Sequence, residues 1–330
     1  MQLINFNEIT SSTPQWLWEP YFPLGKITIV QGDPGDGKTT LILQLAAMLS
    51  RGQLPHMPDV EYEPFEVIYL NAEDGYGDTI KPRLEAAGAD CSHIHTLSED
   101  IHDSPITLDD SRLEGAIKGL NARLLILDPL QAFLGAKVDM HRANEIRPVM
   151  RNLAEMADRT NCAVVLIGHM NKAQGLKASY RGLGSIDFTA AARSVLVVAR
   201  DKNRPNVRVM MQIKNSLAQE GKPIAFELRG SDGVVFLGNY SCNVDDMLLG
   251  AGGSYEYNEA INILREELKD GEKPQKELME SLSQLEVSHQ KIKDIKKELN
   301  IKSIKKSDGW YWKINDKNAQ NSTENLFNMQ

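Results

Sequence analysis

Residues 32–39 read Gly-Asp-Pro-Gly-Asp-Gly-Lys-Thr and match the phosphate-binding pattern G-x-x-x-x-G-K-[ST]. The apolar, β-branched residues 26–31 come before this loop and suit a buried parallel strand. Residues 40–50 come after it and are rich in good helix formers. A strand, a glycine-rich loop and a helix in this order are what phosphate binding requires. The sequence therefore predicts a nucleotide site here.

The loop offers backbone, ammonium and hydroxyl groups to a nucleotide. Its glycines let the backbone curl so that N–H groups point inward at a phosphate, and the helix that follows adds its positive end. Lys38 is expected to reach the β- and γ-phosphates of ATP, and the Thr39 hydroxyl to ligate Mg²⁺. The predicted nucleotide-binding residues are Gly32, Asp33, Pro34, Gly35, Asp36, Gly37, Lys38, Thr39 and Thr40.

The composition is ordinary for a soluble globular protein. The chain has 330 residues, 42% of them hydrophobic and 25% charged, which favours one large domain and a small one. No apolar run is as long as a membrane span, and three scattered cysteines predict a reducing, cytoplasmic location. The net charge of −8 argues against a globally basic nucleic-acid coat. A basic channel must therefore be sought locally.

Strand and helix patterns alternate from the loop to about residue 240. This alternation predicts an α/β fold, with a mostly parallel sheet flanked by helices and an antiparallel extension. The strands are expected at residues 26–31, 65–71, 122–128, 163–168, 193–199, 207–213, 224–228 and 233–237.

Three polar side chains stand where predicted parallel strands end, at the edge that binds ligands. Asp128 ends the third strand and is expected to hold Mg²⁺ together with Thr39. Glu73 follows the second strand and is the predicted base that polarises the attacking water, with Asp74 as the alternative. His169 ends the fourth strand and is a candidate sensor of the γ-phosphate.

The order of these motifs resembles the RecA-like ATPases, in particular the RepA-like members of the hexameric replicative-helicase branch found in plasmids and phages. The resemblance covers residues 15–240 and rests on the phosphate loop, Glu73, Asp128 and residues 169–172. Further matching segments are residues 71–74, 127–130, 181–182 with Ser185, 191–194 and 214–215.

This resemblance implies a homo-oligomer, expected to be hexameric, with ATP at the subunit interfaces. A basic residue would then act on the neighbouring subunit's γ-phosphate. Arg208 and Lys214 are the preferred candidates, and Arg193 and Arg200 are the alternatives.

The resemblance also places DNA-contacting loops after the third and fourth strands. The first loop spans residues 135–143 and offers Lys137, His141 and Arg142. The second spans residues 171–184, carries no acidic residue, and suits single-stranded DNA through backbone charge and base stacking. Its candidate ligands are Lys172, Lys177, Tyr180 and Arg181. A lid over ATP is the alternative role of this second loop.

The composition changes after the predicted ATPase domain, residues 1–245. Residues 246–256 are expected to form a linker, residues 257–314 a winged helix-turn-helix, and residues 315–330 a disordered tail. Residues 289–313 hold eight lysines against three acidic residues. This charge favours duplex DNA as the partner, and a replication protein is the alternative. The proposed DNA-contacting lysines are Lys291, Lys293, Lys296 and Lys297.

Three functions fit these patterns. The first is an ATP-hydrolysing, DNA-dependent motor of the RepA-like helicase type that acts in DNA replication. The second is an ATP-switched DNA-binding initiator or regulator, and the third is a recombination or repair ATPase. From these patterns we expect neither a primase domain nor the N-terminal helical domain of bacterial replicative helicases, and this expectation weakens the first hypothesis.

Overall fold

The structure is a computed structural model that describes residues 3–97, 105–135, 138–140, 142–169, 186–201, 204–229, 233–242, 247, 255–269, 271–283, 285, 287 and 289–315. The chain divides into two compact units, Met1–Ala251 and Gly252–Gln330. No helix in these ranges is both long enough and apolar enough to cross a membrane.

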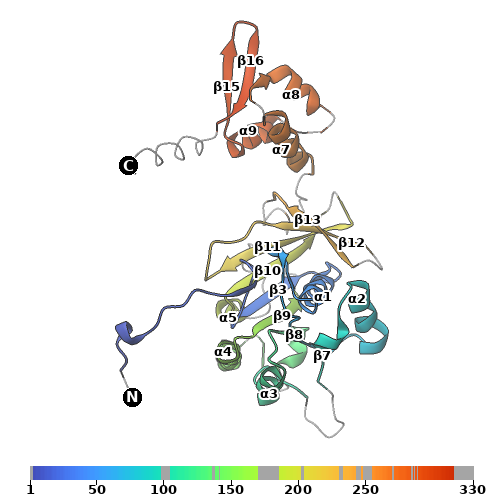
Figure 1. The fold of residues 1–330 in the computed structure, drawn as a ribbon, viewed down its shortest axis with the longest axis vertical. Helices are drawn as coiled ribbons and strands as arrows, with labels where there is room; N and C mark the ends of the chain where they lie inside the picture. The colour runs from blue at the N-terminus through green and yellow to red at the C-terminus, as the bar shows by residue number, and fades with distance from the viewer. Residues whose placement is uncertain are drawn as a thin grey trace. The chain divides into compact units, whose positions relative to one another are not determined.

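A nine-stranded sheet forms the centre of the first unit (Figure 1), with the strand order β13-β12-β11-β10-β3-β9-β8-β6-β7. The six strands from β10 to β7 run parallel, and β11, β12 and β13 extend the sheet in antiparallel pairs. The strands are β3 (Ile27–Gly32), β6 (Val67–Asn71), β7 (Ile94–His95), β8 (Leu124–Asp128), β9 (Ala163–His169), β10 (Ser194–Arg200), β11 (Val207–Asn215), β12 (Ile224–Leu228) and β13 (Val234–Asn239).

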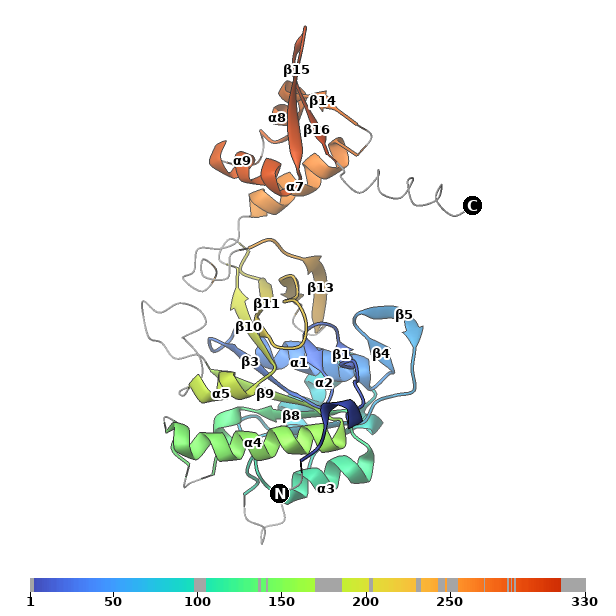
Figure 2. The ribbon, with the colours of Figure 1, turned by 90° about the vertical axis from the view of Figure 1, so that its left-hand side faces the viewer.

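Helices cover both faces of this sheet (Figure 2). Helices α1 (Lys38–Leu49) and α2 (Lys81–Ala86) contribute to one core cluster, and α3 (Ser111–Leu120), α4 (Ala143–Thr160) and α5 (Ile186–Ala191) to another. Every residue of β3 and β8 is buried, because a parallel strand with helices on both faces has no solvent side. The predicted α/β fold class is confirmed.

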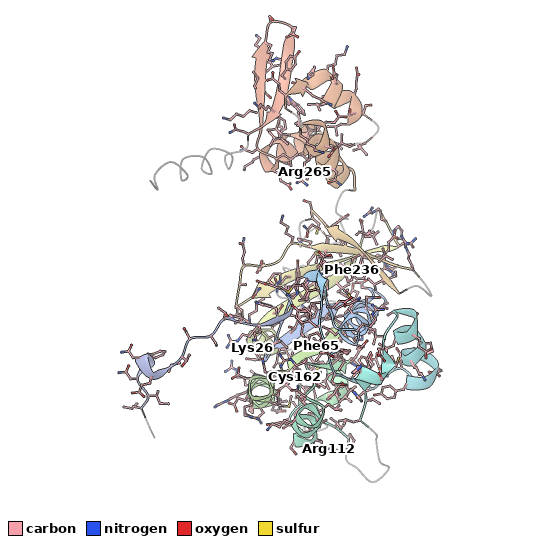
Figure 3. The ribbon with its side chains drawn as sticks, viewed as in Figure 1. Lys26, Phe65, Arg112, Cys162, Phe236 and Arg265 are labelled. Carbon is pink, nitrogen blue, oxygen red and sulfur yellow. The ribbon has the colours of Figure 1, made fainter. Side chains whose placement is uncertain are left out.

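Small elements complete the first unit. They are the 3-10 helices η1 (Phe6–Glu8), η3 (Cys91–His93) and η4 (Leu130–Phe133), the π-helix η2 (Tyr76–Ile80), and the strands β1 (Trp16–Trp18), β2 (Phe22–Pro23), β4 (Gln53–Leu54) and β5 (Met57–Glu61). Phe236 of β13, labelled in Figure 3, packs edge-on against Trp18 with ring centroids 5.4 Å apart. The N-terminal hairpin is thereby attached to the antiparallel end of the sheet.

Within its described residues, the second unit combines three helices with a three-stranded sheet in the order β14-β16-β15. Its elements are α7 (Tyr255–Glu267), β14 (Lys273–Pro274), α8 (Gln275–Ser281), α9 (His289–Glu298), β15 (Ile301–Lys306) and β16 (Gly309–Ile314). Leu264, Leu278, Ile295 and Trp312 meet in its core. Helix α7 begins two residues before the predicted boundary, β14 adds a strand to the predicted pair, and the winged-helix assignment stays a prediction.

Candidate active site

The phosphate loop links β3 to α1 through two glycines at which a larger residue would clash or strain the backbone. A Cβ atom at Gly32 would lie 2.2 Å from the carbonyl oxygen of Val198 in the neighbouring strand. Gly37 caps α1 with a φ of 85°, in the left-handed region that glycine adopts without steric cost. The backbone at Gly32 therefore packs tightly against β10, and Gly37 turns the chain into the first turn of α1.

Lys38 lies across the mouth of this loop and is only 5% exposed. Its Nζ donates hydrogen bonds to the carbonyl oxygens of Gly32 and Asp33, each at 2.9 Å. Burial lowers the pKa of Lys38, while the carboxylates of Asp36 and Asp128 oppose that change. The ammonium group is therefore held inside the loop, where a phosphate group would be bound.

Thr39 and Asp128, the predicted Mg²⁺ ligands, are in direct contact. The Thr39 hydroxyl donates to Asp128 Oδ2 at 2.7 Å, and the Tyr69 hydroxyl donates to the same oxygen at 3.1 Å. Burial raises the pKa of Asp128, and the nearby Glu73 carboxylate raises it further. An oxygen pair with a desolvated carboxylate fits a hard divalent cation, whose charge would favour the ionised form.

Tyr69 was not predicted from the sequence as a site residue. It lies on β6, which pairs with β8 so that Tyr69 is opposite Ile126 and Asn71 is opposite Asp128. The available signal was a single hydroxyl among the otherwise apolar residues 67–70. Only the pairing of β6 with β8 shows that this hydroxyl meets Asp128.

The two candidate bases, Glu73 and Asp74, have different surroundings. The Asn71 side-chain oxygen accepts hydrogen bonds from the backbone N–H groups of both, at 3.2 and 3.3 Å. The Asp74 carboxylate is paired with Arg83 at 3.0 Å. The Glu73 side chain is exposed, and its charge is close enough to raise the pKa of both Lys38 and Asp128. This arrangement favours Glu73 as the base.

Glu73→Gln is expected to keep ATP bound and to lower hydrolysis by roughly a hundredfold, because it removes a positioned base and keeps the side-chain shape. Single-turnover measurements with a direct ATP-binding assay test this expectation. Asp74→Asn is the matched control, since its carboxylate is already paired with Arg83. If the control rather than Glu73→Gln shows the large loss, Asp74 is the base.

His169 ends β9 directly beside the loop, since the strand register pairs it with Gly32. Its Nδ1 is buried and has no hydrogen-bond partner among the described residues. A polar atom in this position is suited to contact a bound phosphate group. Its sensor role stays a prediction.

Arg208 lies at the sheet edge that carries the phosphate loop, and its predicted action on a neighbouring subunit stays a prediction. β10 and β11 pair antiparallel, so the start of β11 returns to the sheet edge where the phosphate loop lies. The carboxylate of Asp36 in that loop is close enough to the Arg208 guanidinium to raise its pKa. The structure therefore places Arg208 beside the loop of its own chain.

Lys214 lies at the opposite end of β11, paired with Val195 at the start of β10. Its Nζ donates to the carbonyl oxygens of Thr189 at 2.7 Å and Ala190 at 3.0 Å, near the end of α5. This position is remote from its own phosphate loop and leaves the predicted action on a neighbouring subunit possible.

The predicted DNA-contacting residues are only partly described. Lys172, Lys177, Tyr180 and Arg181 lie outside the described residues, as do Lys137 and His141. In the second unit Lys293 and Lys297 are exposed and Lys291 is half-buried. The Lys296 ammonium instead lies 4.2 Å from the Trp312 ring centroid and donates to Ser303 Oγ at 2.6 Å, so it joins α9 to β15 and β16. Burial lowers the pKa of Lys296.

The chain is similar to several known proteins. It is 26% identical over 209 residues to DNA repair protein RadA of Halalkalibacterium halodurans, covering 63% of this chain and 40% of that protein. It is 24% identical over 232 residues to DNA repair protein RadA of Streptococcus pneumoniae, covering 70% of this chain and 49% of that protein. The chain thus spans half or less of the length of these relatives.

Among solved structures, a KaiC-like protein PH0186 from Pyrococcus horikoshii OT3 is 20% identical, with a TM-score of 0.48 over 65% of this chain and 91% of that one. The family model described as AAA domain matches residues 2–175, which is more than half of the chain. The family match and the phosphate loop agree with the predicted P-loop ATPase domain, and the RepA-like branch stays a prediction. The chain belongs to the AAA domain family.

Proposed function

We propose that this protein hydrolyses ATP, with Mg²⁺, in a recombination or repair process on single-stranded DNA. The observation that carries the proposal is the contact of Thr39 with Asp128 beside the Lys38 ammonium, with the Glu73 carboxylate near both. These groups are the ones that phosphoryl transfer requires: a clamp for the phosphates, oxygen ligands for the metal ion and a base for water. When bound, Mg²⁺ would neutralise charge on the phosphates.

The choice of repair over replication rests on the relatives, which carry the name DNA repair protein RadA. A replicative-helicase motor of the RepA-like type is the competing function. Both functions need a DNA-dependent ATPase, so the DNA product that forms during ATP hydrolysis distinguishes them. Strand pairing or branch extension on single-stranded DNA supports the repair function, and unwinding of a forked duplex supports the motor.

The DNA dependence is assigned to the second loop, residues 171–184. Changing Lys172, Lys177 and Arg181 together to alanine is expected to abolish stimulation of ATP hydrolysis by single-stranded DNA. The salt dependence of DNA binding should flatten by about two units of slope, because three phosphate contacts are lost. ATPase rates with and without DNA, and binding across a salt series, provide the measurements.

A matched variant controls for the loss of three positive charges. Lys118, Arg151 and Lys222 are exposed and lie on α3, on α4 and just before β12. Changing these three to alanine should leave DNA stimulation intact, because long-range charge alone is strongly screened by salt. Equal losses in both triple variants would show a general charge effect. If DNA still stimulates ATP hydrolysis fully in the loop variant, the result would favour the alternative role of the loop as a lid over ATP.

A further inference from the structure

Two arginines face each other across the pair of strands next to the phosphate loop. The register of β10 and β11 places Arg200 directly opposite Arg208. Val198 and Met210, two residues along each strand, belong to the same core cluster as Leu41 of α1. Because side chains alternate along a strand, both arginines share the face of the sheet that carries α1. Like charges opposite each other in a sheet repel, so this pair of arginines requires a compensating interaction.

Both arginines approach the phosphate loop of their own chain. The Arg200 Nη2 donates to the carbonyl oxygen of Gly35 at 3.3 Å, and Asp36 acts on the charge of Arg208. The next strand also meets the loop, since a Cβ atom at Gly37 would lie 3.0 Å from Leu228 Cδ1. The ends of β10, β11 and β12 therefore form one wall of the nucleotide site.

Arg208 is buried without an ion pair among the described residues. It is 6% exposed, and its Nη1 donates only to the carbonyl oxygens of Pro205 at 2.5 Å and Val207 at 3.2 Å. Its Nε has no hydrogen-bond partner in the part of the chain that the structure describes. Burial lowers the pKa of Arg208, and the charge of Arg200 lowers it further against the opposing effect of Asp36.

A buried cation without an ion-pair partner is costly, and arginine does not escape the cost by losing its proton. Two neutral carbonyl groups satisfy hydrogen-bond donors but supply no net negative charge. An anion that reaches both guanidinium groups would offset their repulsion and accept a hydrogen bond from the Arg208 Nε. Phosphate suits this geometry, because the planar guanidinium group makes paired hydrogen bonds to phosphate oxygens.

We propose that Arg200 and Arg208 bind the phosphate chain of the nucleotide held by the loop of their own chain. The inference rests on the proposed binding of ATP and deepens it. It replaces the predicted role of Arg208 in a neighbouring subunit by a contact within one subunit. A polyphosphate would relieve the repulsion between the two guanidinium groups, so that binding favours ATP over nucleotides with fewer phosphates.

The test uses the full chain with Arg208→Met and Arg208→Lys variants. Unfolding is followed by scanning calorimetry, and binding of ATP, ADP and AMP by isothermal titration. Arg208→Met is expected to keep or raise the melting temperature without nucleotide, because it removes a buried unpaired charge and keeps the volume. It should weaken ATP binding by about ten- to a hundredfold, ADP binding less, and AMP binding little. Arg208→Lys should regain part of the ATP affinity.

Arg229→Met is the matched control, since Arg229 follows β12 at the same sheet edge but is exposed and paired with Glu227 at 3.1 Å. It should change none of these affinities. A lower melting temperature with unchanged ATP affinity for Arg208→Met would make Arg208 a structural residue and overturn the proposal. Equal weakening of ATP, ADP and AMP would overturn the preference for polyphosphates too, by assigning the contact to the α-phosphate, the ribose or the base that all three share. A wild-type protein that binds ATP but is not stimulated by DNA would contradict the proposed function and leave this inference standing.

Discussion

Replacing Lys38 by alanine is expected to reduce ATP turnover to less than about one thousandth of the wild-type rate, since removal of one preorganised transition-state donor costs 10²–10³-fold and the lysine also binds the ground state. The Lys38 ammonium is buried at the centre of the loop and held by the carbonyl oxygens of Gly32 and Asp33. The ammonium group is placed to stabilise the negative charge that develops on the β–γ bridging oxygen during hydrolysis. Alanine would leave the backbone N–H groups of the loop but no mobile positive charge.

Steady-state phosphate release, with and without single-stranded DNA, measures this effect. Lys26→Ala is a suitable control, because Lys26 comes just before the same strand, β3, at the edge away from the loop, where it pairs with Asp158. Loss of this partly exposed ion pair should lower the stability only slightly and leave the rate of ATP turnover unchanged. Turnover of Lys38→Ala within tenfold of the wild-type rate would show that the loop is not the site of hydrolysis.

The parts of the site that depend on one stretch of chain were predictable from the sequence. The loop between β3 and α1 needs glycines at fixed positions and a lysine in the first helical turn, and these requirements are local. Asp128 could be placed because a buried parallel strand brings its last residue to the ligand edge. Thr39 and Asp128 then meet because β8 and β3 are separated only by β9.

The parts that depend on contacts between distant segments were not predictable. Glu73 and Asp74 are neighbours of similar chemistry, and only the pair between Asp74 and Arg83 of α2 separates their surroundings. The position of Arg208 depends on the register of β10 against β11, which the sequence left open. Lys296 belonged to a lysine-rich run predicted to face DNA, but Trp312 from β16 provides an aromatic ring that it covers.

Lys214 carries the second large expected effect, because it is the preferred candidate that lies away from its own phosphate loop and could act on a neighbouring subunit. Lys214→Ala is expected to lower ATP turnover by about a hundred- to a thousandfold, as for other groups that stabilise transition-state charge, with nucleotide affinity nearly unchanged. Lys214 is paired with Val195 at the start of β10, while Arg200 at the end of β10 contacts the loop. Lys214 therefore cannot serve its own site without a large rearrangement.

A structural role must be separated from this catalytic one, because Lys214 donates to the carbonyl oxygens of Thr189 and Ala190 at the end of α5. Lys214→Gln keeps a donor for those carbonyls but removes the charge. If Lys214 acts on a neighbour's phosphate, glutamine and alanine should impair turnover equally and arginine should restore part of it. If Lys214 only caps α5, glutamine should restore turnover, and the loss in Lys214→Ala should follow its melting temperature.

Mixing the inactive variants completes the argument. A Lys38→Ala subunit lacks its own phosphate clamp but still presents Lys214, whereas a Lys214→Ala subunit keeps an intact loop. In a mixed ring or filament, a Lys214→Ala subunit beside a Lys38→Ala subunit regains a complete site, so activity should rise above that of either variant alone. The gain should depend on the mixing ratio, since only one order of neighbours is productive. Co-assembly shown by mass measurement, without any gain at any ratio, would exclude catalysis shared between subunits.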